Sequence, residues 1–158
     1  MKRKLVGFVI LSGTTLFAYN AFNAQASNGA NAATQVQIGD VAFQLNEAET
    51  QQKIVDGSGF HNEKPTTDNG AWLVLDATIT NAGLQQVAID SQIVYRLVTT
   101  NGAIYTPTAI NMDDFFGVEN INPGLQVTGQ LAFEVPNNLK DYELQIEYDG
   151  QEEIISLP

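Results

Sequence analysis

The sequence contains no cysteine, and only seven of its 158 residues are lysine or arginine. Without cysteine the chain has no disulfides, no thiolate metal sites and no cysteine nucleophile. Few basic residues exclude a DNA- or RNA-binding surface, because phosphate recognition needs clustered lysine and arginine. The single histidine, His61, argues against a zinc site, which needs three or four ligands. A chain of this length fits one domain, held together by its own core.

The first 26 residues have the layout of a secretory signal peptide. Basic residues at 2–4 precede an apolar stretch over 5–17, and the small-x-small sequence Ala24-Gln25-Ala26 follows. We expect cleavage after Ala26, with 30–32 as a second candidate. The alternative is a membrane anchor, but the polar residues 12–15 shorten the apolar run below the roughly 20 residues of a span. The sequence therefore predicts a secreted protein, at most loosely associated with the cell surface.

Cleavage would make the chain strongly acidic. Residues 1–26 contain three basic residues and no acidic one, so their removal leaves four basic residues against 18 acidic ones, a net charge of −14. Such a charge favours solubility and opposes binding to anionic surfaces.

Alternating apolar residues dominate the rest of the chain. Residues 27–34 are small and polar and are expected to form a flexible lead-in, and 35–158 are expected to form the domain. Short strands separated by turn residues predict an all-β fold, an Ig-like β-sandwich of about seven to eight strands. Polar sequence predicts two long loops, 46–70 and 108–124, the second with a helical turn over 111–117.

The predicted strands are read from period-two alternation and from turn signals. The run Ala71–Thr80 is apolar on both faces for half its length, which predicts a central strand covered by a second layer. Asn101-Gly102 and Asp149-Gly150 predict hairpin turns, and Pro107 and Pro136 are expected to end strands. The predicted strands cover 36–38, 41–45, 71–80, a short strand beginning at 87, 93–98, 104–105, 126–135, 142–148 and 154–157.

The order of several short motifs resembles a known family. The motifs are Ile38–Phe43, Gly70–Asn81, Tyr95-Arg96-Leu97, Asn101-Gly102 before Tyr105, Asn122-Pro123-Gly124 and Gly129–Pro136. Together they resemble a secreted bacterial Ig-like domain of unknown function, sometimes labelled "telomeric repeat-binding factor 2" and grouped with the immunoprotective extracellular antigens of mycobacteria. The resemblance implies an Ig-like sandwich, often exported by Gram-positive bacteria, with no established catalytic residues. The acidic charge of this chain contradicts the telomere label.

The densest acidic group in a predicted loop is Asp113, Asp114 and Glu119. Ca²⁺ takes carboxylate and carbonyl oxygens from loops of this kind, so these residues are candidate metal ligands, although no calcium-loop motif accompanies them. The alternative is a pair of acids at a helix start, where the helix dipole favours negative charge.

Three aromatic residues of the predicted loops are candidate partner contacts: Phe60, Phe115 and Phe116. If their rings are exposed, they can anchor an extracellular protein or a cell-envelope component. The alternative is that they cap the core. The edge strands of a sandwich can also pair between chains, so we expect a monomer or a weak dimer.

Catalytic signatures are weak. Ser58 and His61 share a glycine-containing loop, but the G-x-S-x-G elbow of serine hydrolases does not occur. No carboxylic acid is singled out by its sequence surroundings as the proton donor of a glycosidase. The glycine-rich motif of phosphate-binding loops does not occur. The sequence therefore favours a non-enzymatic extracellular binding domain without a cofactor, with calcium or small-ligand binding as the alternative and a hydrolase as a weaker one.

Overall fold

The computed structural model describes residues 34–157. The predicted signal peptide 1–26, with its cleavage residues Ala24 and Ala26, lies outside the described residues, as does the lead-in up to residue 33. The first strand begins at Thr34, one residue earlier than the predicted start of the domain.

The described residues form twelve strands and one short helix, and nine of the strands overlap a predicted strand. The elements are β1 (Thr34–Ile38), β2 (Val41–Gln51), β3 (Ile54–Val55), β4 (Asn62–Glu63), β5 (Gly70–Asn81), β6 (Val87–Ala88), α1 (Ile89–Gln92), β7 (Ile93–Thr99), β8 (Ile104–Tyr105), β9 (Asn120–Ile121), β10 (Gln126–Pro136), β11 (Tyr142–Tyr148) and β12 (Gln151–Ser156).

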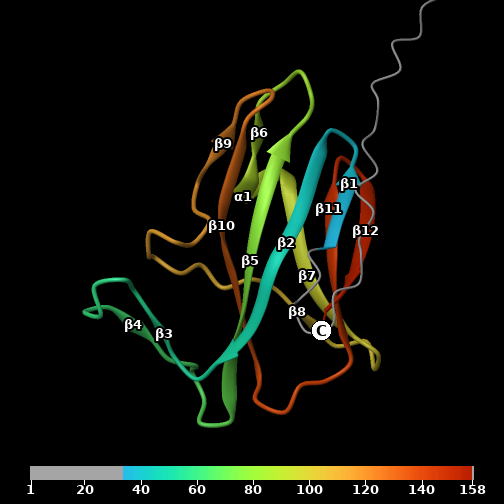
Figure 1. Ribbon diagram of the computed structural model, residues 1–158. Helices are drawn as coiled ribbons and strands as arrows, with labels where there is room; N and C mark the ends of the chain where they lie inside the picture. Colours follow the sequence, from blue (N-terminus) through green and yellow to red (C-terminus); the bar gives the residue numbers. More distant parts are fainter. Residues whose placement is uncertain (1–33, 158) are drawn as a thin grey trace, which may run out of the picture.

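Two four-stranded antiparallel sheets pack face to face, which confirms the predicted β-sandwich (Figure 1). One sheet has the strand order β1-β2-β5-β10, and the other has the order β12-β11-β7-β8. The β3–β4 hairpin projects away from the sandwich in Figure 1, whereas β6 and β9 form a small pair beside β10.

The strand order corresponds to that of the immunoglobulin fold, in which A, B and E share one sheet and C, F and G the other. Strands β2, β5 and β10 take the places of A, B and E, and β7, β11 and β12 take those of C, F and G. Strand β8 takes the place of C′. Between β8 and β10, where strand D would run beside E, the chain makes only two isolated bridges to β10.

Inward-facing side chains of both sheets form the main core. Phe43 from β2, Leu75 from β5, Leu97 from β7, Phe133 from β10 and Leu144 from β11 are all buried there. Because every second residue of a strand points to the same face, alternating apolar residues of these five strands reach this core.

The outer face of the first sheet carries a second, smaller cluster. Trp72 and Val74 of β5 and Ala132 of β10 are buried there under Ile54 of the hairpin and Phe115 of the β8–β9 connection. The prediction that β5 is a covered central strand is therefore confirmed. The second sheet covers its inner face, and side chains from the hairpin and the β8–β9 connection cover its outer face.

Asn81 joins two loops at the end of β5. Its fully buried side-chain amide donates to the carbonyl oxygens of Gln85 and Ile121, at 2.6 and 2.8 Å, and its Oδ1 accepts from Gly83 N–H at 2.9 Å. The residue therefore caps the strand and fixes the β5–β6 connection against the segment before β10.

Three local predictions were wrong. The predicted loop 46–70 contains the second half of β2 and the β3–β4 hairpin, because polar β2 residues still pair with β5 as far as Gln51 opposite Trp72. Over 111–117 there is no helix but one turn, closed by Phe115 N–H donating to Met112 O at 3.1 Å. After β6 the chain forms α1 instead of continuing the predicted strand. No helix within 34–157 has the length and apolar character needed to cross a membrane.

Candidate binding site

The chain between β8 and β10 is held along the outer edge of β10. Thr108 N–H donates to Ala132 O at 2.8 Å, Gln130 N–H donates to Asp114 O at 2.8 Å, and Phe116 N–H donates to Gln130 O at 3.0 Å. The loop between these anchors folds over the outer cluster, where Ile110 and Met112 pack. We call residues 106–117 the side segment.

A hollow of about 360 Å³ lies under the side segment, and we call it the side hollow. Its walls come from α1, the first half of β7, the side segment and the middle of β10. Most lining side chains are apolar, among them Ile93, Val94, Ile110, Phe116 and Leu131. The volume falls within the range of about 300–1,000 Å³ that is usual for small-molecule pockets, and the mixture of apolar walls with few polar groups is also typical of them.

Phe116 holds its place in this wall because residue 129 is a glycine. A β-carbon at position 129 would lie 2.8 Å from Cδ1 and Cε1 of Phe116. The ring can therefore lie directly against the backbone of β10 only while that residue has no side chain.

Tyr95 is the most deeply buried polar residue that lines the side hollow. The residue is 6% exposed, and the centroid of its ring lies 6.1 Å from that of Phe43. Burial raises the pKa of its hydroxyl far above the ordinary value of 10.0. Its Oη has no hydrogen-bond partner among the described residues, and Trp72 Nε1 and Glu119 Oε2 share this property.

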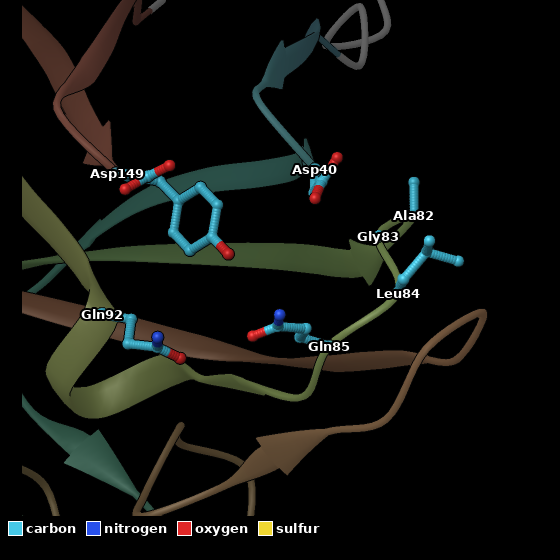
Figure 2. Close-up of a pocket in the computed structure, with 8 residues that line it drawn as sticks. Asp40, Ala82, Gly83, Leu84, Gln85, Gln92 and Asp149 are labelled. Atoms are coloured by element: carbon cyan, nitrogen blue, oxygen red, sulfur yellow. The ribbon is translucent and has the colours of Figure 1, made fainter.

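A second hollow of about 720 Å³, the end hollow, lies where β5 and β11 finish (Figure 2). It is lined mainly by polar residues of turns, with the carboxylates of Asp40 and Asp149 on opposite sides and the amides of Gln85 and Gln92 along one edge (Figure 2). Partial burial and the two carboxylates raise the pKa of Tyr148, which also lines it. This hollow therefore repels anions.

The three candidate calcium ligands lie on the side segment and just after it. Asp113 and Asp114 are exposed on the 112–115 turn, whereas Glu119 is half-buried and its carbonyl oxygen accepts from Ile89 N–H at 2.9 Å. Within 34–157, no three histidine, aspartate or glutamate side chains gather into a group that could hold a metal ion. Calcium binding stays a prediction.

The three candidate partner aromatics have different surroundings. Phe115 is buried in the outer cluster, Phe116 is half-buried in the wall of the side hollow, and Phe60 is 87% exposed near the tip of the β3–β4 hairpin. Phe115 and Phe116 therefore cover hydrophobic surface, as the alternative interpretation expects.

Ser58 and His61 do not contact each other as a catalytic pair would. Both bind the Asp56 carboxylate, Ser58 Oγ at 2.8 Å and His61 Nδ1 at 2.8 Å. These hydrogen bonds, that of His61 first and that of Ser58 second, lower the pKa of Asp56 to about 2. The three residues therefore form a polar turn at the end of an exposed hairpin, in which the serine hydroxyl donates to the carboxylate and not to the imidazole that would activate it in a serine–histidine pair.

Several lining residues of the side hollow were missed by the sequence analysis. Tyr95, Gly117 and Gln130 belong to three segments that are remote in sequence, and only the fold brings them together. One signal was present, since Pro107 ends β8 as predicted and leaves the first half of β7 without a neighbour on that side.

The fold is shared with several solved structures at low sequence identity. A conserved hypothetical protein from Bacillus anthracis is 14% identical with a TM-score of 0.59, covering 78% of this chain and 92% of its own. An uncharacterized β-sandwich protein from Clostridium difficile is 13% identical with a TM-score of 0.57, covering 77% and 87%. The secreted protein MPT63 from Mycobacterium tuberculosis is 14% identical with a TM-score of 0.52, covering 79% and 92%.

These similarities are of fold alone, and none of these three descriptions names an enzymatic activity. The search of curated proteins found no match. A family model described as a domain of unknown function, DUF4352, matches residues 31–154, which include almost all of the described β-sandwich. The resemblance to a bacterial domain of unknown function is thus confirmed at this level, whereas its grouping with the immunoprotective antigens stays a prediction. The chain belongs to the DUF4352 family of domains of unknown function.

Proposed function

We propose that this protein is an exported, non-enzymatic binding domain and that its binding site is the side hollow. The observation that carries the proposal is an apolar hollow built beside the sandwich by a long connection that is itself anchored to β10. Long connections on a rigid sandwich are the usual carriers of recognition.

Export is supported by the layout of residues 1–26 and by a fold shared with a protein described as secreted. The absence of cysteine is compatible with this, because two sheets of buried apolar residues supply the core. The hydrogen-bonding of Ser58 to Asp56 favours a binding role over a hydrolase.

A neutral, apolar fluorophore tests the binding site. We expect N-phenyl-1-naphthylamine to increase its emission on mixing with the purified protein and to bind in the side hollow. The change Gly117→Trp should abolish this signal, because residue 117 lines the hollow and a β-carbon there meets no atom within 4 Å. A tryptophan at this position at the wall of the hollow therefore has room and need not disturb the backbone.

The matched control is Gly57→Trp, since a β-carbon at Gly57 also meets nothing within 4 Å and the residue lies in the hairpin, outside the side hollow. It should leave the signal unchanged. Equal emission from the wild type and Gly117→Trp, or no emission at all, would contradict the proposed site.

A further inference from the structure

The first half of β7 has an unpaired backbone edge, and this edge borders the side hollow. Thr99 N–H donates to Ala103 O at 3.0 Å, and Leu97 pairs with Tyr105. Because the N–H and C=O of alternate strand residues point to the same edge, Tyr95 directs its backbone groups to the β8 edge as Thr99 and Leu97 do.

Pro107 is the residue that would pair with Tyr95 in this register. Proline has no N–H, so it cannot donate to the Tyr95 carbonyl, and β8 ends at Tyr105. The next residue, Thr108, turns to β10 and donates to Ala132 O. Within residues 34–157, apart from the hydrogen bonds between paired strands, no backbone–backbone hydrogen bond involves Tyr95 N–H or the Tyr95 carbonyl.

Tyr95 therefore offers one backbone donor and one backbone acceptor beside apolar walls. Tyr95, Pro107 and Thr108 all line the side hollow. This pair of groups matches the amide donor and carbonyl acceptor of a single residue in an extended chain, and a pure hydrocarbon ligand would leave both unsatisfied.

We propose that the side hollow binds an extended apolar peptide segment of a partner protein, which pairs as a short strand with Tyr95 in the place that Pro107 leaves free. This is strand addition, in which main-chain hydrogen bonds provide affinity and side-chain pockets provide specificity. The inference rests on the proposed function and adds the chemical class of the ligand.

Charge favours basic residues beside the apolar segment. Asp90 is exposed at the wall of the hollow, and no lysine or arginine of residues 34–157 lines it. The whole chain carries a net charge of −11. The probe is therefore acetyl-Lys-Val-Ile-Val-Lys-amide, whose lysines flank a short run of strand-forming residues.

Amide hydrogen exchange of the purified protein tests the pairing. In the free protein, Tyr95 N–H should exchange at least about tenfold faster than Leu97 N–H and Thr99 N–H, which are paired with the β8 hairpin. Saturating probe peptide should slow the exchange of Tyr95 N–H by at least about tenfold. Analogues methylated on one backbone nitrogen at a time should include one that binds at least about tenfold more weakly, because methylation removes the donor to Tyr95 O.

The change Pro107→Val restores the missing N–H. We expect β8 to extend to residue 107, which then pairs with Tyr95 of β7. Tyr95 N–H should be protected from exchange without any peptide, and peptide binding should weaken at least about tenfold. The matched control is Thr106→Val, which places the same side chain in the same wall and leaves the backbone donors unchanged; it should bind the peptide as the wild type does.

The outcomes separate this inference from the proposed function. If the fluorophore binds and the peptide does not, or if the peptide binds without protecting Tyr95 N–H, strand pairing is wrong and the side hollow remains a binding site. Slow exchange of Tyr95 N–H in the free protein also overturns the inference. If neither the fluorophore nor the peptide binds, both proposals fail.

Discussion

The β3–β4 hairpin and the side segment both lie in regions predicted as long loops, but the structure places them differently. The hairpin contains one phenylalanine, Phe60, and the side segment contains two, Phe115 and Phe116. The hairpin pairs with itself, Ile54 opposite Glu63, so its tip extends into solvent and Phe60 is exposed. The side segment pairs with β10, so it lies on the sandwich and Phe115 is buried.

In these two segments, backbone pairing decides which phenylalanine is buried. Hydrophobicity alone does not distinguish Phe60 from Phe115. Hydrogen bonds from Thr108, Gln130 and Phe116 hold the side segment close enough for Phe115 to reach Trp72. The hairpin contributes Ile54 from its base to the same cluster, and its tip contributes nothing to it.

The largest difference between the two segments should appear on truncating their aromatics. Phe115→Ala should lower the free energy of unfolding by about 3 kcal/mol, because it leaves a cavity in the outer cluster. Phe60→Ala should change it by less than about 0.5 kcal/mol, as is usual for exposed positions. Urea denaturation followed by the fluorescence of Trp72, the single tryptophan, measures both. Equal losses from the two changes would show that the hairpin tip packs as firmly as the side segment.

Substituting one glycine beside each segment should again lower the free energy of unfolding more at the side segment than in the hairpin, by a smaller amount. Gly129→Ala brings a methyl group to 2.8 Å from the Phe116 ring, so the ring must move. We expect the free energy of unfolding to fall by about 1–2 kcal/mol, within the usual range for overpacking. Fluorophore binding in the side hollow should also weaken. Thermal and urea denaturation measure the loss.

Gly57→Ala is the control for this change, because its methyl group would meet nothing within 4 Å. It should be neutral. Adding Phe116→Ala to Gly129→Ala tests the cause, since the double variant should lose less than the two single changes together if the clash with the ring is responsible. Strict additivity would place the cost of Gly129→Ala elsewhere.

The sequence predicted the sandwich well because each long strand has one buried face, and period-two alternation records that face directly. It did not predict the second half of β2, whose polar residues are held by pairing with β5 and by Asn46 Nδ2 donating to Asp76 Oδ1 at 2.7 Å. Pairing of this kind depends on a neighbouring strand and leaves little mark on local composition.

The side hollow could not be predicted from the sequence, because it depends on the pairing register of β7 with β8. Asn101-Gly102 predicted the hairpin, but a two-residue loop would place Pro107 opposite Arg96. The observed loop has one more residue, with Gly102 at φ +85° and Thr99 N–H donating to Ala103 O, so Pro107 falls opposite Tyr95. One residue of register therefore decides which backbone groups of β7 face the hollow.

The smallest effect concerns pH, and it should be confined to the hairpin tip. The ordinary pKa of an aspartate is 3.8, and that of Asp56 is lowered to about 2. A lowered pKa means that the folded tip prefers the charged carboxylate. Its stabilisation is therefore fully present above about pH 4 and is lost as the pH falls through about 2. The amide chemical shifts of Phe60 and His61 should follow this titration, while those of Phe115 and Phe116 should not report it.

Variants identify the cause of the low pKa. Asp56→Asn should remove the transition from the Phe60 and His61 amides. His61→Ala should raise its midpoint toward 3.8 more than Ser58→Ala does, because the hydrogen bond from His61 is the larger of the two causes. A midpoint near 3.8 in the wild type would mean that the turn of Asp56, Ser58 and His61 is not formed in solution. The hairpin would then lack the side-chain hydrogen bonds at its tip, and its contrast with the anchored side segment would be sharper still.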